Sequence, residues 1–116
     1  MGTRPDLLRG ALDAVLLEVI SAGKTYGYEI AREIEVRSAG QLLPQEGTLY
    51  PALHRLEKRG YLKADWRDSP EGRARKHYRL TAEGRRKLAA LRQEWEQFSQ
   101  SVSRILGTAH AAWEGI

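Results

Sequence analysis

Basic side chains are concentrated in the middle of this chain, and their chemistry suits binding to a polyanion. Residues 45–80 hold nine Lys or Arg against five Asp or Glu, in a chain of 116 residues with a net charge of +4. The stretch RARKHYR, residues 73–79, contains no acid at all. Such a local excess of cations attracts nucleic acids even when the total charge is modest. The alternative interpretation is a solvated charged surface without a ligand.

Groups that could support catalysis are scattered along the chain. The three histidines, His54, His77 and His110, fall in different predicted elements, and the sequence has no HExxH pair, nucleophile elbow or phosphate-cradling glycine loop. The absence of cysteine excludes disulfides and thiolate chemistry. We therefore predict that the chain is not an enzyme and holds no metal or cofactor.

The segment EGTLYPALHRLEKRGYL, residues 46–62, must position much of this polar chemistry. Four apolar residues fall within about 100° on a helix and predict a core face: Leu49, Ala52, Leu53 and Leu56. Pro51 lacks a backbone donor, so the helix must begin within about one turn upstream, near residues 45–47, and Arg59-Gly60 ends it.

The other face of this helix carries groups that can donate hydrogen bonds to phosphates or bases. These candidate contacts are Thr48, Tyr50, His54, Arg55 and Lys58. Gly47 permits a close approach of the helix backbone to another backbone. Two alternatives remain. Thr48 can be a helix cap and nothing more, and Tyr50, at the edge of the apolar face, can be partly buried in the core.

Two further helices are predicted upstream. In residues 7–23 the apolar positions recur at helical spacing, and they are Leu8, Leu12, Val15, Leu16, Val19 and Ile20. Gly23 is placed to end this helix. In residues 25–40 either Tyr28, Ala31 and Ile34 or Ile30 and Ile34 face inward, and Gly40 lies near the end.

A change to alternating polarity after Gly60 predicts a β-hairpin. Leu62, Ala64 and Trp66 on one strand, and Tyr78 and Leu80 on the other, would form its core face. The turn residues DSPEG make a tip, about 68–74, that should project. Exposed cations near this tip are the second set of candidate phosphate contacts: Arg73, Arg75 and Lys76.

A long helix is predicted over residues 82–106, with Thr81 as its N-cap and Gly107 as its interruption. Its apolar residues follow a coiled-coil seam of Leu88, Leu91, Trp95, Phe98, Val102 and Ile105. At 1.5 Å per residue the helix would be about 37 Å long, which exceeds what the preceding domain can cover. A second copy of the chain would therefore bury part of the seam, although the helix can also fold back onto its own domain. Residues 108–116, TAHAAWEGI, are either a further short turn or a tail.

Three helices, a hairpin and a long helix give a mainly α fold with a β-hairpin, in the order of a winged helix-turn-helix followed by a C-terminal dimerisation helix. The length suits one compact unit, in which residues 1–80 bind DNA and residues 81–116 form the dimerisation helix and tail. Composition is that of a soluble globular protein, with no apolar run long enough for a membrane and no signal-peptide core, so we expect a cytoplasmic location.

Three successive blocks carry a family resemblance: GYEIAREI, EGTLYPALHRLEKRGYL and RKHYRLTAEGRRKL. Their order and spacing over residues 8–91 resemble those of the short, single-domain PadR family of bacterial transcriptional regulators. The resemblance implies a homodimeric DNA-binding protein, usually a repressor, whose third helix enters the major groove and whose wing reaches flanking backbone or minor groove. In that family, polar residues at the positions of Thr48, Tyr50, Arg55 and Lys58 face double-stranded DNA. A two-fold dimer in turn predicts a pseudo-palindromic operator.

The resemblance also implies an effector site. Some multidrug-sensing members have a ligand pore lined by a tryptophan of the C-terminal helix, and Trp95 lies at a similar place with Phe98 nearby. Phenolic acids are the effectors of other members, so the expected ligand is a small planar or phenolic molecule. The competing interpretation assigns Trp95 to interface packing. For the whole chain, the rival function is a winged-helix protein-interaction module without specific DNA binding.

Overall fold

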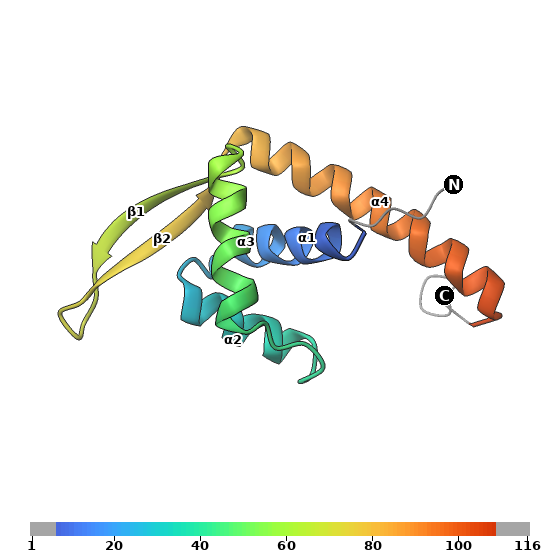
Figure 1. Cartoon of the computed structure of the whole chain (residues 1–116), viewed down its shortest axis with the longest axis horizontal. Coiled ribbons are helices and arrows are strands. Elements are labelled where there is room, and N and C mark those ends of the chain that lie inside the picture. Colours follow the sequence, from blue (N-terminus) through green and yellow to red (C-terminus); the bar gives the residue numbers. More distant parts are fainter. Residues whose placement is uncertain (1–6, 109–116) are drawn as a thin grey trace.

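A computed structural model describes residues 7–108, with side chains from residue 10 onward, and it confirms the predicted mainly α fold with a hairpin (Figure 1). The elements in chain order are α1 (Leu7–Ser21), α2 (Gly27–Arg37), α3 (Glu46–Lys58), β1 (Leu62–Asp68), β2 (Ala74–Leu80) and α4 (Ala82–Leu106). The hairpin and α4 extend in opposite directions from the packed helices. Residues 109–116 and the side chain of Leu8, which the sequence patterns included, lie outside the described part.

The hydrophobic core is formed by α1, α2, α3, the base of the hairpin and the first half of α4. Leu16 and Leu17 at its centre are fully buried, and all four predicted core residues of α3 are buried with them. In α2, Ile30 and Ile34 face the core, whereas Tyr28 is 69% exposed. The alternative with Tyr28 inward is therefore wrong, because two residues at 100° each place Tyr28 about 200° from Ile30.

The bounds of α3 agree with the prediction from Pro51 and Arg59-Gly60. The helix begins at Glu46 after the N-cap Gln45 and ends at Lys58 before the C-cap Arg59. Pro51 is the sixth residue of α3, just beyond the first turn, so the carbonyl of Gly47 lacks the hydrogen bond that a residue four positions on would normally donate.

The wing is defined here as β1, the turn 69–73 and β2. Its strands are antiparallel, paired from Leu62 with Leu80 to Asp68 with Ala74. The base is buried through Leu62, Tyr78 and Leu80, but Trp66 is 67% exposed. The prediction that Trp66 continues the core face is wrong because β1 leaves the core after Ala64. Alternating polarity does not show at which residue a strand stops packing against other elements.

The segment before α2 fixes the wing to the helices. Tyr26 forms a β-bridge with His77, and the amide of Tyr78 donates to the carbonyl of Thr25 at 2.9 Å. The Thr25 hydroxyl also lies 2.8 Å from Nδ1 of His77. The wing therefore has a fixed base and a tip that projects beyond it.

The long helix α4 has the predicted ends. The Thr81 hydroxyl accepts from the amide of Gly84 at 3.0 Å and donates to the carbonyl of Gly60 at 2.6 Å, and Gly107 ends the helix with φ of 73°. Leu88 and Leu91 of the seam are buried within the chain's own core, whereas Ile105 is 83% exposed. The second half of α4 thus extends beyond the domain (Figure 1). No helix within residues 7–108 is long and apolar enough to cross a membrane.

Candidate nucleic-acid interface

The outward face of α3 presents most of the polar residues that the sequence singled out. Thr48, His54 and Lys58 are exposed along this face, and Tyr50 is nearly half exposed. A Cβ atom added at Gly47 would meet no atom of the described residues within 4 Å, so the backbone there is open to a close neighbour. The buried side of the helix already supplies its packing, which leaves this second face free for a ligand.

Arg55 lies in a different place from the other candidates on α3. Its guanidinium donates to the carboxylate of Asp13 on α1, and its side chain is only 25% exposed. Asp13 is 5% exposed, and burial raises the pKa of its carboxyl while the charge of Arg55 offsets part of that effect. Arg55 therefore ties α3 to α1, a role that the sequence did not suggest.

Two of the three wing cations are less exposed than predicted, since each is paired with a carboxylate. Nη2 of Arg75 lies 2.6 Å from Oε1 of Glu71, and Nζ of Lys76 lies 2.9 Å from Oε1 of Glu57 on α3. The hydrogen bond that Lys76 donates to Glu57 raises the pKa of Lys76, so this side chain stays charged at neutral pH. Arg73 is exposed in the turn, as predicted.

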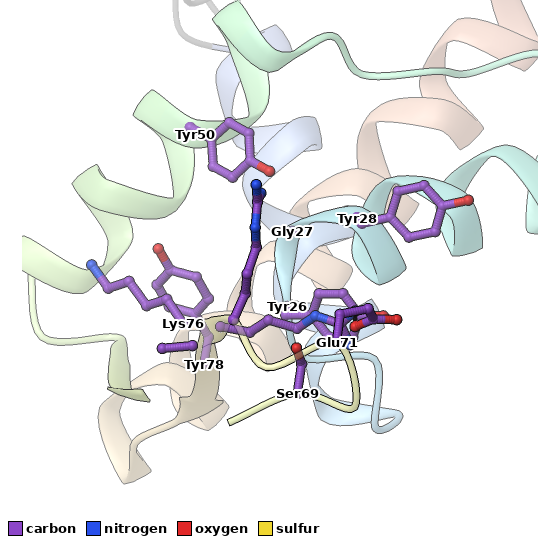
Figure 2. Close-up of a pocket in the computed structure, with 11 residues that line it drawn as sticks. Tyr26, Gly27, Tyr28, Tyr50, Ser69, Glu71, Lys76 and Tyr78 are labelled. Atoms are coloured by element: carbon purple, nitrogen blue, oxygen red, sulfur yellow. Dashed lines mark hydrogen bonds and ion pairs between the residues drawn. The ribbon is translucent and has the colours of Figure 1, made fainter. Parts of the chain in front are cut away.

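A pocket lined mainly by tyrosine and charged residues lies where α2, α3 and the wing meet (Figure 2). We call it the tyrosine pocket, and it has a volume of about 530 Å³. Its lining consists of Tyr26, Gly27, Tyr28, Tyr50, Ser69, Glu71, Arg73, Ala74, Arg75, Lys76 and Tyr78. Burial raises the pKa of Tyr78, so its phenol is neutral. Four of the eight predicted DNA contacts, Tyr50 and the three wing cations, thus come together at one place.

A second cavity, the α1/α4 groove, is lined by residues of α1, α2 and α4 and is largely apolar, with a volume of about 870 Å³. Trp95 contributes to it from α4, and Phe98 contacts Trp95 with 5.9 Å between ring centroids. The remaining lining residues are Ala11, Ala14, Val15, Glu18, Val19, Ile34, Arg37, Ser38, Leu42, Leu88 and Arg92. Of the two predicted effector residues, Trp95 lines this groove and Phe98 contacts Trp95.

Several residues of these sites were missed from the sequence. Asp13 is an acid inside the apolar stripe of α1. An acid at such a position indicates a buried partner, so the sequence did contain a signal for this contact. Glu71 and Arg75 are four residues apart across the predicted turn, a separation at which the turn brings their side chains together. Tyr26 and Gly27 gave no comparable signal. Only the folded arrangement brings Gly27 next to Tyr50 and places Tyr26 in the same pocket.

Taken together, the packed helices α1 to α3, a basic hairpin fixed beside α3 and an exposed polar face on α3 define the winged helix-turn-helix class. The family model described as "Transcriptional regulator PadR-like family" matches residues 16–90. The chain belongs to the PadR-like family of transcriptional regulators.

Individual relatives agree with this family. A transcriptional regulator of Mycobacterium tuberculosis is 35% identical over 107 residues, which cover 92% of this chain and 94% of that protein. A transcriptional regulator from Clostridium thermocellum has a similar structure, with a TM-score of 0.77, 33% identity and coverage of 85% and 96%. A PadR-like regulator from Bacillus cereus gives a TM-score of 0.72 at 30% identity, with coverage of 87% and 96%.

The family membership decides two of the sequence-based predictions. Members are transcriptional regulators rather than enzymes, which confirms the prediction that this chain is not an enzyme. PadR-like regulators bind DNA and typically form dimers. The prediction of a DNA-binding regulator is thereby confirmed at the level of the family.

Proposed function

We propose that this protein is a sequence-specific, ligand-responsive repressor that acts as a homodimer on a pseudo-palindromic operator. The observation that carries the proposal is the exposed polar face of α3 beside a basic wing. In this arrangement α3 enters the major groove and the wing contacts flanking backbone or minor groove. Repression is the outcome that the family resemblance supports.

The dimer is proposed to form through the second half of α4. Trp95, Phe98 and Ile105 lie on one seam and are exposed in the single chain, whereas the first two positions of the seam, Leu88 and Leu91, are buried. A two-fold partner would cover these exposed side chains and set the distance between the two α3 helices. That distance must match successive major grooves, roughly 34 Å apart.

The effector is proposed to be a small planar or phenolic molecule bound in the α1/α4 groove near Trp95. An effector that prefers a different crossing of the two α4 helices would shift the population away from the spacing that fits DNA. In a titration of candidate effectors against the DNA complex, Trp95→Ala should reduce the response by a larger factor than it reduces DNA affinity without effector. Equal loss of both would instead leave Trp95 with a role in dimer packing alone.

DNA binding is tested by fluorescence anisotropy with a labelled duplex from the region upstream of the gene, against a scrambled duplex, over a salt series. Each phosphate contact contributes about 0.9 to the slope of log affinity against log salt. Arg73→Gln should lower the slope by about this amount and weaken both duplexes alike. The matched control is Arg86→Gln, which removes an exposed arginine of α4 paired with Glu83. This control should leave the slope unchanged.

The second candidate function is a winged-helix protein-interaction module. If the wild-type protein bound neither duplex even at low salt, this candidate would take first place. Tight and selective binding with a steep salt slope would reject it. The exposed polar face of α3 favours the regulator, because a protein-binding surface is usually depleted in charge at its centre.

A further inference from the structure

The tyrosine pocket contains an arginine that is already engaged by an anion. The guanidinium of Arg75 lies over the ring of Tyr26, with 4.4 Å from Cζ to the ring centroid, and bonds to the carboxylate of Glu71 at 2.6 Å. Tyr26 is bridged to His77 of β2, so stacking on its ring holds the cation in place. Glu71 comes from the turn 69–73, and its side chain is 65% exposed. The acid of this pair is therefore the partner that can leave.

Other groups around the pocket also suit a negative charge. Gly27 opens α2, and a helix start carries amide groups without partners in the helix and a partial positive charge. The N-cap residue Tyr26 makes no side-chain hydrogen bond to these amides. Arg73 and Lys76 line the same pocket. An anion placed here would meet several cationic or donor groups at once.

Hydroxyl groups complete the lining. The hydroxyl of Tyr50 points toward Gly27 (Figure 2), so closely that a Cβ atom at Gly27 would lie 2.6 Å from it. The hydroxyl of Ser69, which also lines the pocket, is buried and has no hydrogen-bond partner within residues 7–108. Figure 2 shows Glu71 and Ser69 on the turn below Tyr26. The lining of the pocket thus comes from α2 and its N-cap residue, from α3 and from the wing.

We propose that the tyrosine pocket binds a phosphate of the DNA backbone and that Glu71 is an internal counterion, which this phosphate displaces from Arg75. This inference rests on the proposed function, since it requires a duplex on the exposed face of α3. A backbone phosphate carries the same single negative charge as the carboxylate and accepts the same hydrogen bonds. Because a phosphate carries no sequence information, Glu71 lowers the affinity for every duplex alike.

Glu57 pairs with a cation of the wing as Glu71 does, but it is held differently. The Lys76–Glu57 pair joins the wing to α3, and both side chains are about one-third exposed, at 31% each. Glu57 is held on a helix, whereas Glu71 lies on the turn. Only the Glu71 pair combines a fixed cation with an acid that is free to turn outward. Binding of DNA therefore exchanges the partner of Arg75 and keeps that of Lys76.

The test is Glu71→Gln, which removes the charge and keeps the size of the side chain. Affinity for both a specific and a scrambled duplex at ~50 mM salt should increase by about two- to fivefold, the range expected for releasing an exposed ion pair. The matched control is Glu83→Gln, which makes the same change in net charge and frees Arg86 at the start of α4. This control should not alter affinity.

Combining Glu71→Gln with Arg75→Gln shows whether Glu71 acts through Arg75. In Arg75→Gln the affinity should be lower than in the wild type, and adding Glu71→Gln should no longer increase it. An unchanged or weakened affinity in Glu71→Gln alone would overturn the proposal. An equally large increase in affinity when Glu71→Gln is added to Arg75→Gln would also overturn it, because Glu71 would then act through the net charge of the protein and not through Arg75.

The outcomes also separate this proposal from the proposed function. If the wild-type protein bound no duplex, the DNA-binding function itself would fail. If the wild type bound DNA and Glu71→Gln left the affinity unchanged, the function would stand and the role of Glu71 would be rejected. Thermal unfolding of each variant shows that it is folded, and the exposure of Glu71 predicts little change in stability.

Discussion

Because Arg55 contacts Asp13, we expect Arg55→Gln to lower the stability of the fold and to leave the salt dependence of DNA binding unchanged. Replacing Arg55 by Gln leaves the Asp13 carboxylate, 5% exposed, without its charged partner. Breaking a buried ion pair in this way costs about 3–5 kcal/mol. Since the Arg55 side chain is 25% exposed and water reaches the pair, we expect the lower end, about 3 kcal/mol. That is a large part of the roughly 5–15 kcal/mol by which a domain is stable.

The assay is urea unfolding followed by circular dichroism at one fixed protomer concentration, because a dimer's stability depends on concentration. With a slope of about 2 kcal/mol per M urea, the midpoint should fall by roughly 1.5 M. Asp13→Asn combined with Arg55→Gln should recover part of the loss, because the double variant no longer buries an unpaired charge. The salt slope of DNA binding should remain that of the wild type.

The loss of folding stability in Arg55→Gln should also depend on pH. Burial raises the pKa of Asp13 above 3.8 in the folded state, so on acidification the folded protein binds this proton before the unfolded chain does. The contribution of Asp13 to stability therefore increases as pH falls through the folded pKa toward 3.8. Without Arg55 this pKa rises further, so the difference between variant and wild type should narrow on acidification. A variant with wild-type stability and a salt slope lower by about 0.9 would refute this account and make Arg55 a phosphate contact.

Three further predictions concern backbone fit and capping. Gly84→Ala should lower the melting temperature strongly, because the new Cβ would lie 2.1 Å from the carbonyl oxygen of Tyr61, which is backbone and cannot turn aside. Gly47→Ala has free space and should raise the melting temperature slightly through helix propensity, while anisotropy shows weaker DNA binding. Thr81→Ala should cost about 1 kcal/mol in urea unfolding, because it removes the cap of α4. An unchanged melting temperature in Gly84→Ala, or unchanged urea midpoints in Thr81→Ala, would contradict the packing described for the start of α4.

The ends of the helices could be predicted because single residues determine them. Pro51 limits how far upstream α3 can begin, and Gly60 follows its end. Thr81 and Gly107 lie at the two ends of α4. Each acts through local backbone chemistry that the sequence displays. The core faces of α1 and α3 followed from helical spacing in the same way. Local signals of this kind do not depend on which other element lies opposite.

Contacts between distant elements could not be predicted in this way. Helical spacing put Arg55 on the polar face of α3, but only the packing of α1 against α3 brings Asp13 within reach. The alternation in β1 continued through Trp66 although the core ends two residues earlier. For the tyrosine pocket, the sequence indicated the cations and missed Tyr26 and Glu71, whose role depends on the fold of the wing against α2.

Recognition of a specific sequence by α3 is tested by selecting duplexes from a random library with the purified protein and sequencing them. We expect enrichment of a two-fold symmetric sequence with half-sites about 10 base pairs apart, the spacing of successive major grooves. Enrichment should disappear in a variant with altered outward residues of α3, such as Thr48→Ala with His54→Ala, which keeps the core face intact. Recovery of duplexes without any common sequence would contradict a sequence-specific regulator built on α3.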